Sequence, residues 1–235
     1  MTKVLHVLSA ARVWTLKDGT EHPTGFWAEE FVVPYTLFTE AGFDVTLATP
    51  GGKQPVVDEL SLGIKGGVLP GAAKKLRGEL ERLAPVLERP ANLSSIDPDD
   101  YDIVFYSGGH GPMEDLAVDE VSGALLTKRL ASGRSLALLC HAPAAALAAK
   151  NPDGSWPFKG YTMTGLSNAE ERLNPFAWKA KWLLEDRLTQ AGADYTHGLP
   201  LKSNIIVDRN LYTGQNPGSS KALAQRIIAD VTGAR

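Results

Sequence analysis

Cys140 is the only cysteine of the 235-residue sequence, and its position predicts chemistry rather than packing. The apolar run 135–139 precedes it, and His141 and an alanine-rich segment that includes Pro143 follow it. This pattern predicts a strand-to-helix turn, because proline suits the first helical turn. The N-terminus of the helix would then stabilise a thiolate at Cys140. The histidine is suited to proton transfer, since its ordinary pKa lies near neutral pH. A lone cysteine is more often a small buried hydrophobe, but the turn and the adjacent histidine favour a nucleophile.

Two pairs of glutamates supply candidate carboxylates for the same site. Glu170 and Glu171 follow a β-type run, and one of them is the candidate for the acid that orients the histidine. Glu29 and Glu30 begin another predicted helix. Acidic residues in a first helical turn also stabilise the helix by their charge alone, which is the structural alternative for both pairs. A carboxyl group that faces the thiol and relays its proton needs a raised pKa instead.

A glycine-rich turn is the third feature that can take part in chemistry. It consists of Gly108, Gly109, His110 and Gly111 and follows a further apolar run. Its backbone N–H groups are not shielded by side chains, so together with the amide of His141 they suit an oxyanion hole. The turn lacks the lysine and the Ser/Thr of a nucleotide-binding P-loop and the spacing of a dinucleotide-binding fingerprint.

The histidines of the sequence do not have the spacing of a metal site. There are five, and none forms a motif such as His-Glu-x-x-His. The sequence therefore predicts neither a metal nor a cofactor, although His22, His110 and His141 can still meet in space.

Short apolar runs alternate with helical segments and must position these residues. The alternation predicts an α/β fold with a mostly parallel central sheet and helices on both faces. In such sheets the functional cleft lies beyond the carboxyl ends of the strands, where the turns after them converge. The predicted strands are 4–8, 43–48, 102–106, 135–139, 161–164, 205–207 and 211–213. The predicted helices are 27–41, 72–88, 119–132, 143–150, 179–190 and 217–231.

Two features depart from the regular alternation. Pro34 lies within the first predicted helix and is expected to kink or interrupt it, because proline lacks an N–H donor. The glycine-rich and proline-rich segment 50–98 is interpreted as a cap-like insertion at one sheet edge rather than as a second domain. We therefore expect residues 1–235 to form a single domain.

The composition excludes several classes of partner. A net charge of −3 gives no broad basic surface for nucleic acid or an anionic membrane. No apolar run approaches the roughly 20 residues that span a bilayer, and the first residues read as a strand rather than a signal peptide. A single cysteine cannot form an internal disulfide. These observations predict a cytoplasmic protein without nucleic-acid or membrane partners.

Taken together, these turns resemble the ThiJ/PfpI superfamily, specifically its heat-shock chaperone and glutathione-independent glyoxalase (glyoxalase III) branch. The resemblance extends over almost the whole chain, and its order and spacing are specific. One departure is Ala142, where the family commonly has glycine. The matching segments are 25–30 with Pro34, 41–45, 108–111 with Asp115 and Leu116, 140–144, Thr164 and Gly165 with Glu170 and Glu171, and 213–217.

The resemblance implies a flavodoxin-like three-layer sandwich, similar to class I glutamine amidotransferases and usually dimeric. It also implies the roles of the site residues. Cys140 would be the nucleophile, His141 its partner and Glu171 the acid of a triad, with Glu170 as the fallback. Glu30 matches the carboxyl group that the family places near the sulfur.

The expected activity is the conversion of methylglyoxal or a similar 2-oxoaldehyde to a 2-hydroxy acid such as D-lactate, without glutathione. The same nucleophile is compatible with a protein or nucleotide deglycase, another cysteine hydrolase or a redox sensor. A holding chaperone is the alternative from a different class. It rests on aromatic residues near loops, for which core or dimer packing is the competing explanation: Trp14, Phe26, Trp27, Trp156, Phe158, Phe176 and Trp178.

Overall fold

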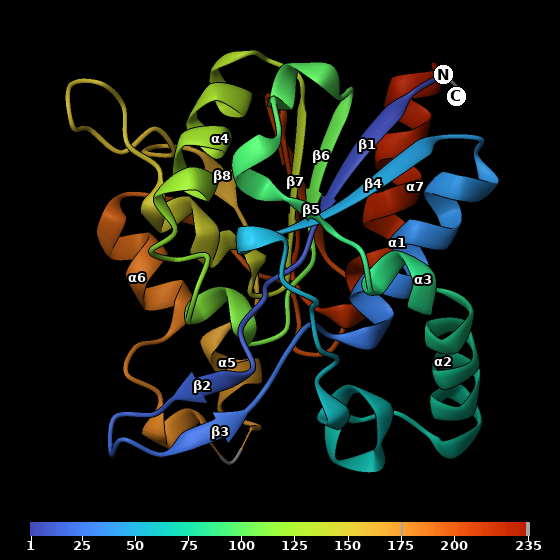
Figure 1. The fold of residues 1–235 in the computed structure, drawn as a ribbon. Coiled ribbons are helices and arrows are strands. Elements are labelled where there is room, and N and C mark those ends of the chain that lie inside the picture. Colours follow the sequence, from blue (N-terminus) through green and yellow to red (C-terminus); the bar gives the residue numbers. More distant parts are fainter. Residues whose placement is uncertain (175, 234–235) are drawn as a thin grey trace.

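A seven-stranded sheet lies at the centre of the computed structural model, which describes residues 1–174 and 176–233 (Figure 1). Neighbouring strands are parallel, except for the last two along the chain, which form an antiparallel pair. The strands lie in the order β10 (Ile205–Asp208), β11 (Leu211–Gly214), β7 (Ser135–Leu139), β6 (Ile103–Tyr106), β1 (Lys3–Val7), β4 (Asp44–Thr49) and β5 (Ala91–Asn92).

Helices cover both faces of this sheet (Figure 1). Side chains alternate along the strands, so that Val4 and Phe105 pack on one face with α1 and α7. Leu5 and Val104 pack on the other face with α4. This three-layer arrangement confirms the predicted flavodoxin-like α/β fold. The helices are α1 (Ala28–Glu40) and α7 (Ser220–Thr232) on the first face, and α4 (Glu120–Ala131), α6 (Leu184–Ala191) and the 3₁₀ segment η7 (Ala142–Ala148) on the second.

The segment 50–98 lies beside α1 and at the edge of the sheet (Figure 1). Leu83 and Leu87 from this segment pack against Phe31 of α1, and β5 forms the outermost strand next to β4. The segment contains η1 (Pro50–Gly52), η2 (Glu59–Leu62), η3 (Ile64–Gly66), α2 (Pro70–Arg82), α3 (Ala84–Leu87), β5 and η4 (Leu93–Ser95), and η5 (Pro98–Asp100) begins at its end.

The predicted strand 161–164 does not belong to the central sheet. Only β8 (Thr162–Met163) is extended there, and it pairs with β9 (Asp194–Tyr195) in a separate two-stranded sheet. The Thr162 amide donates to the side chain of Asp208 at 2.8 Å, so β8 packs beside the edge strand β10. A hairpin of β2 (Val13–Thr15) and β3 (Glu21–Pro23) forms in a region that the pattern does not predict as strand.

Pro34 lies inside α1 without ending it, so the predicted interruption is wrong. Proline cannot donate to the carbonyl of Glu30, one turn earlier in the helix. The hydroxyl of Ser107 replaces this donor at 2.7 Å. Because the hydroxyl proton is used in this way, Ser107 accepts a hydrogen bond from Nε2 of His6, also at 2.7 Å. The first turn of α1 is thereby tied to the residue that follows β6.

Other predicted helices form with shifted limits. The alanine-rich helix predicted at 143–150 is the 3₁₀ segment η7, and the helix predicted at 179–190 begins later, as α6. None of the helices formed by the described residues is long and apolar enough to cross a membrane. The remaining short elements are η6 (Gly111–Met113), α5 (Asn168–Glu171), η8 (Ala177–Lys179) and η9 (Pro217–Ser219).

Candidate active site

Cys140 lies in a tight elbow directly after β7. Its φ of 59° is in the left-handed region, which non-glycine residues rarely adopt and which is often found at functional sites. The elbow is held from the partner strand, because the Cys140 amide donates to the carbonyl of Gly214 at 2.8 Å. The cysteine is only 4% exposed. The predicted strand-to-helix turn is present, with a 3₁₀ segment in place of the α-helix.

His141 connects the thiol to a carboxylate. Its Nδ1 lies 3.5 Å from the sulfur of Cys140, and its Nε2 lies 2.5 Å from Oε2 of Glu171. Burial opposes ionisation of Glu171, but the charges of His141 and His110 outweigh it and hold the pKa of this carboxyl group well below its usual range. The ionised carboxylate accepts a hydrogen bond from Nε2–H, which leaves the Nδ1 lone pair facing the thiol. The structure thus brings the three expected triad residues together.

Glu170, the fallback for the triad acid, points elsewhere. Its carboxylate accepts hydrogen bonds from the side chains of Gln215 and Asn216, both at 2.7 Å, and from the Leu201 amide at 2.8 Å. It also closes a capping box with Ser167 at the start of α5. These bonds hold α5 in place, and α5 in turn positions Glu171.

Glu30 lies on the other side of the thiol, in the first turn of α1. Its Oε2 accepts a hydrogen bond from the amide of Gly108 at 2.8 Å, whereas Oε1 is buried without a hydrogen bond to a described nitrogen or oxygen. Burial raises the pKa of Glu30 to about 8, although hydrogen bonds with Cys140 and Gly108 oppose the rise. At neutral pH this carboxyl group is therefore mostly protonated.

The thiol itself is less acidic than the sequence predicts. Burial, followed by the adjacent Glu30, raises the pKa of Cys140 well above its ordinary value. This is the opposite of the direction expected from a helix N-terminus. Removal of the sulfur from water outweighs the dipole of the short 3₁₀ segment that follows it. Cys140 is a thiol at rest and needs a base, which His141 Nδ1 can supply.

The glycine turn packs directly on the cysteine elbow. A Cβ at Gly108 would lie 2.7 Å from Glu30 Oε2 and 2.8 Å from the His141 amide, so only glycine fits. Gly109 has a φ of 88°, which also favours glycine. The Gly108 N–H already donates to Glu30. The His110 side chain turns away from the sulfur and bonds to Glu171 Oε1 at 2.9 Å. The sequence does not predict this bond, and its only signal is the histidine within the glycine turn.

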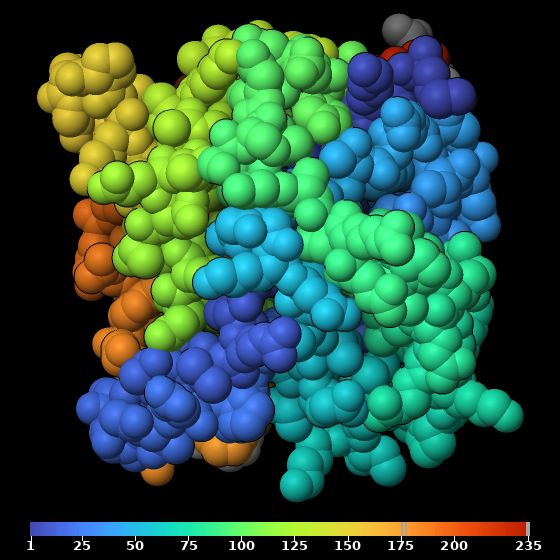
Figure 2. All heavy atoms as spheres, viewed as in Figure 1, coloured from blue at the N-terminus to red at the C-terminus, as the bar shows by residue number. Residues whose placement is uncertain are grey.

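A hairpin and a loop cover the site. Trp14 of β2 stacks on His110 with ring centroids 4.2 Å apart, and His22 of β3 packs on Phe176 at 3.9 Å. The Lys17 amide donates to the Lys179 carbonyl at 2.8 Å, which joins the hairpin to the segment 176–179. In Figure 2 the hairpin, in blue, covers the end of the molecule below the sheet. We call the hairpin and this segment the lid.

A cavity of about 1040 Å³ lies beside the lid. It is lined by His22, Pro23 and Thr24 and by the segment 57–81, but by none of the four residues expected to be catalytic. Residues of the hairpin and of the 50–98 segment thus border a cavity next to the site.

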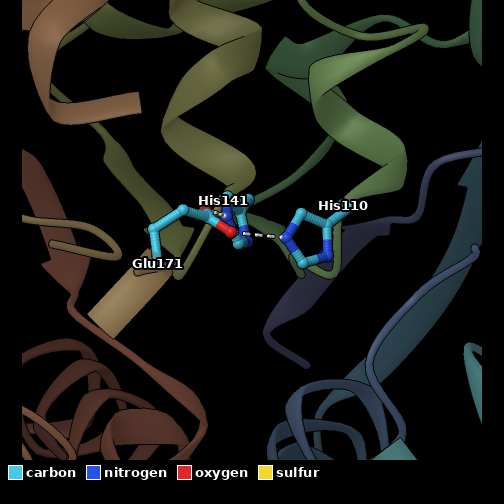
Figure 3. A group of neighbouring side chains, drawn as sticks. All are labelled: His110, His141 and Glu171. Atoms are coloured by element: carbon cyan, nitrogen blue, oxygen red, sulfur yellow. Dashed lines mark hydrogen bonds and ion pairs between the residues drawn. The ribbon is translucent and has the colours of Figure 1, made fainter. Parts of the chain in front are cut away.

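Three donor atoms suited to a metal ion meet in this site. His110, His141 and Glu171 each offer one atom, all within 4.8 Å of one another (Figure 3). The distances between histidine nitrogens and carboxylate oxygens are 2.9 and 2.5 Å. Ligand atoms around a tetrahedral zinc ion lie roughly 3.3 Å apart, given metal–ligand distances of about 2.0–2.1 Å. The cluster is therefore a hydrogen-bonded network whose facing atoms are already paired.

The fold and the site together define a class of protein: a flavodoxin-like α/β protein with a cysteine at a strand-to-helix elbow, a neighbouring histidine and two buried glutamates. The model of the DJ-1/PfpI family matches residues 22–230. The chain belongs to this family.

Two relatives named for an enzymatic activity, and a third protein of the same fold, also resemble this chain. It is 28% identical over 243 residues to the protein/nucleic acid deglycase HchA of Staphylococcus aureus, covering 99% of this chain and 80% of that relative. The crystal structure of glyoxalase III from Candida albicans is 26% identical, with a TM-score of 0.83 and coverage of 97% and 96% of the two chains. The 24 kDa rapid encystment protein of Francisella tularensis has the same fold, with a TM-score of 0.86, 23% identity and coverage of 98% and 99%.

Proposed function

We propose that this protein converts small 2-oxoaldehydes such as methylglyoxal to 2-hydroxy acids, without glutathione. One observation carries the proposal: the Cys140 thiol lies between a base, His141 Nδ1 at 3.5 Å, and a carboxyl group, Glu30, that is protonated at neutral pH. Addition of a thiol to an aldehyde needs both, one to take the thiol proton and one to protonate the new oxyanion. The likeness to glyoxalase III supports this choice of reaction.

The first half of the reaction forms a hemithioacetal. His141 takes the thiol proton at Nδ1 while the sulfur adds to the aldehyde carbon, and Glu171 stabilises the imidazolium through Nε2. Glu30 gives its proton to the aldehyde oxygen, and the turn at Gly109 lies nearby to stabilise the developing charge. At this point Glu30 is a carboxylate and His141 is an imidazolium.

The second half moves hydrogen from one carbon to the next. Glu30 removes the proton from C1, and His141 protonates the ketone oxygen on C2, which gives an enediol. Glu30 then delivers its proton to C2 while His141 takes back the hydroxyl proton on C1, so that a thioester results. Water hydrolyses the thioester and releases the 2-hydroxy acid and the free thiol. The net reaction adds one water and needs no oxidant or reductant.

The enclosed site supports a small substrate. The cysteine is 4% exposed, and Trp14 of the lid stacks on His110 of the same site, so a three-carbon aldehyde fits the site better than a sugar adduct on a folded protein. Deglycation of proteins or nucleotides, suggested by the name of the Staphylococcus relative, is the competing reaction of the same nucleophile. The substrates of a deglycase are larger, so the lid would have to open more widely to admit them.

The structure gives little support to a holding chaperone based on exposed aromatic residues. Of the seven aromatic residues on which this alternative rests, Trp14, Phe26 and Phe158 are buried. Trp178 is exposed, with 68% of its surface accessible to solvent. Aggregation assays with Cys140→Ser test this alternative separately. A chaperone function independent of the site leaves suppression of client aggregation intact in that variant.

The deciding experiment measures D-lactate and L-lactate formed from methylglyoxal by the wild type, Cys140→Ala and Cys140→Ser. We expect lactate from the wild type without glutathione, and loss of at least about 1,000-fold in both variants. His197→Gln, at a partly exposed histidine, is the control and should retain activity. Equal lactate formation by wild type and Cys140→Ala contradicts the proposal. Release of glycated amino acids without lactate formation favours the deglycase.

A further inference from the structure

We propose that Tyr195 is a positioning residue of the site: its hydroxyl holds the backbone of Leu166, which in turn fixes the elbow at Cys140. The same backbone leads into α5, the helix that carries Glu171. The consequence for catalysis rests on the proposed function. The contacts themselves do not, and they can be measured in the absence of turnover.

The elbow at Cys140 is held by one hydrogen bond on each side of the residue. Its φ of 59° is unfavourable for a residue with a Cβ, so the surrounding structure must maintain it. The Cys140 amide donates to the Gly214 carbonyl at 2.8 Å, and the Cys140 carbonyl accepts from the Leu166 amide at 3.0 Å. The first bond comes from the central sheet, in which β11 pairs with β7. The second comes from the backbone after β8, outside that sheet, and needs a support of its own.

Tyr195 supplies this support. Its hydroxyl donates to the Leu166 carbonyl at 3.1 Å, so Leu166 is bonded to the elbow through its N–H and to Tyr195 through its C=O. Tyr195 belongs to β9, which runs parallel to β8 and pairs Tyr195 with Met163. The Thr196 amide extends this pairing, because it donates to the Met163 carbonyl at 2.9 Å. The small sheet of β8 and β9 therefore carries the hydroxyl to the place where it meets Leu166.

Gly165 shows how closely these groups approach one another. A Cβ on this residue would lie 2.7 Å from the Cys140 carbonyl oxygen and 2.8 Å from the Tyr195 hydroxyl oxygen. It would also lie 3.0 Å from a methyl carbon of Leu184. Only glycine lets the cysteine elbow and the tyrosine hydroxyl reach the same stretch of backbone.

This stretch of backbone also positions the acid of the expected triad. Ser167 follows Leu166 directly and caps α5, where it forms a capping box with Glu170. The Glu171 amide donates to the Ser167 carbonyl at 2.9 Å, one helical turn later. A shift of Leu166 therefore moves both the thiol, through the elbow, and the Glu171 carboxylate, through α5. His141 lies between these two groups, so such a shift changes the geometry of proton transfer.

The first test removes the hydroxyl and keeps the ring, in Tyr195→Phe. We expect the Leu166 amide to exchange its hydrogen roughly 10-fold faster in this variant, because the segment opens more often once the bond to its carbonyl is lost. The matched control is Tyr212→Phe, which removes a hydroxyl that bonds to Asp230 of α7 at 2.9 Å. The control should leave exchange of the Leu166 amide unchanged. Native-state hydrogen exchange followed by NMR measures both variants without a substrate.

Kinetics with methylglyoxal provide the second readout. We expect kcat to fall roughly 10-fold in Tyr195→Phe while KM stays within about twofold, because the substrate still binds but proton transfer is misaligned. Tyr212→Phe, which also loses one hydrogen bond of a tyrosine, should keep both constants. A merely structural contribution of the hydroxyl to stability lowers neither kcat nor KM of the folded enzyme.

Gly165→Ala tests the same contact from the other side. Its methyl group pushes the Tyr195 hydroxyl and the Cys140 carbonyl away, so kcat should fall roughly 10-fold or more. Once the bond of the hydroxyl is broken in this way, the addition of Tyr195→Phe should lower kcat by less than about twofold. Effects of the two substitutions that multiply in the double variant contradict a shared contact.

The outcomes are distinguishable from failure of the proposed function. If the wild type makes no lactate, hydrogen exchange at Leu166 still decides the role of Tyr195. The inference is overturned if Tyr195→Phe leaves this exchange rate unchanged, or if Tyr212→Phe accelerates it equally. In an active enzyme, an unchanged kcat of Tyr195→Phe overturns it as well. If Tyr195→Phe does not fold, as judged by circular dichroism, exchange at Leu166 in Gly165→Ala gives the same decision: faster exchange supports the inference and an unchanged rate overturns it.

Discussion

Glu30 and Cys140 form a buried pair in which both acids hold their protons at rest. Burial raises the pKa of each group; Glu30 raises that of Cys140 further, whereas the hydrogen bond with Cys140 lowers that of Glu30. Such a pair can give one proton to a substrate oxygen while the other passes to a base. This division explains why a carboxyl group and a histidine flank the sulfur from opposite sides.

The pKa of Glu30 predicts a basic limb in the activity profile. Because the pKa is about 8, the proton that Glu30 donates to the aldehyde oxygen is lost above this pH. We expect kcat/KM of the wild type to fall above about pH 8. Glu30→Gln, which can still accept from the Gly108 amide, should lose about 100-fold or more in kcat and show no such limb. Steady-state rates between pH 6 and 10 check this, and an identical basic limb in the variant contradicts it.

The same group predicts a change of stability with pH. The pKa of Glu30 rises from 4.5 to about 8 on folding, so the folded protein binds an additional proton between these values. The contribution of the protonated Glu30 to the free energy of unfolding is fully present below pH 4.5 and is lost as the pH rises through 8. The loss amounts to at most about 1.4 kcal/mol per pH unit. Urea unfolding at pH 5 and pH 8 should therefore show a smaller loss for Glu30→Gln than for the wild type. Glu40→Gln, at the exposed end of the same helix, should behave as the wild type does.

Candidate residues could be located from the sequence because they follow strands. The elbow at Cys140 and the acidic first turns are local patterns, and the carboxyl ends of parallel strands converge. The choice of Glu171 over Glu170 could not be derived from the pattern and rested on the family resemblance. The bond between His110 and Glu171 was not predicted because it depends on side-chain directions from two distant turns. The raised pKa of Cys140 was missed because burial of the sulfur and its contact with Glu30 depend on tertiary packing.

At the level of elements, a proline in α1 helps to position the site. Pro34 leaves the Glu30 carbonyl without a helical donor, and Ser107 supplies the missing hydrogen bond. The residue next to Ser107, Gly108, binds the Glu30 side chain. Backbone and side chain of Glu30 are thus both held from the end of β6.

A double-mutant cycle tests this link. Ser107→Ala should lower the free energy of unfolding by about 1–3 kcal/mol, because it leaves the buried Glu30 carbonyl unsatisfied. Pro34→Ala restores a helical N–H for the same carbonyl, so Ser107→Ala should cost about 1 kcal/mol less in that background. Urea unfolding of the four proteins measures the coupling. Additive effects of the two substitutions speak against a shared carbonyl.

The lid predicts how fast reagents reach the thiol. Phe176→Ala removes the ring that packs on His22 at 3.9 Å, so the lid should open more often. We expect alkylation of Cys140 by iodoacetamide to become roughly 10-fold faster. Trp178→Ala changes a neighbouring aromatic residue that is 68% exposed and should leave the rate unchanged. Equal acceleration by both substitutions argues against a specific contact.

The sequence predicted the central strands better than the peripheral ones. Buried strands such as β6 and β7 are continuous apolar runs, and this pattern is specific. The run 161–164 also has β-forming residues but alternates them with threonine, and it packs outside the sheet, where β11 occupies the position beside β7. The two-residue strand β5 and the hairpin of β2 and β3 are too short to leave a periodic signal.

At the scale of the whole molecule, the buried side chain of Arg129 connects the segments that lead into the neighbouring strands β6 and β7. Arg129 of α4 donates to four carbonyl oxygens, those of Pro98, Tyr101, Asp102 and Ser135. These carbonyls precede β6 and begin β7, at the end of the sheet away from the site. Burial lowers the pKa of Arg129 to about 10, so it stays charged at neutral pH.

We expect Arg129→Met to lower the free energy of unfolding by about 3 kcal/mol or more, since four carbonyl acceptors, all of them buried or partly buried, lose a charged donor. We propose that the chain, as a single domain, still unfolds in one calorimetric transition in this variant. Arg134→Ala removes a partly exposed arginine from the same region and should change the stability by less than about 1 kcal/mol. Two resolved transitions contradict the single-domain proposal.

The two edges of the central sheet bear on how copies of this chain can associate. At one edge β5 has two residues, and at the other β10 is flanked by β8 and by a hydrogen bond to Asp208. Short or covered edge strands prevent a neighbouring chain from extending the sheet. We therefore expect the predicted homodimer to form through helix faces or loops, with both sheet edges left unpaired by the partner.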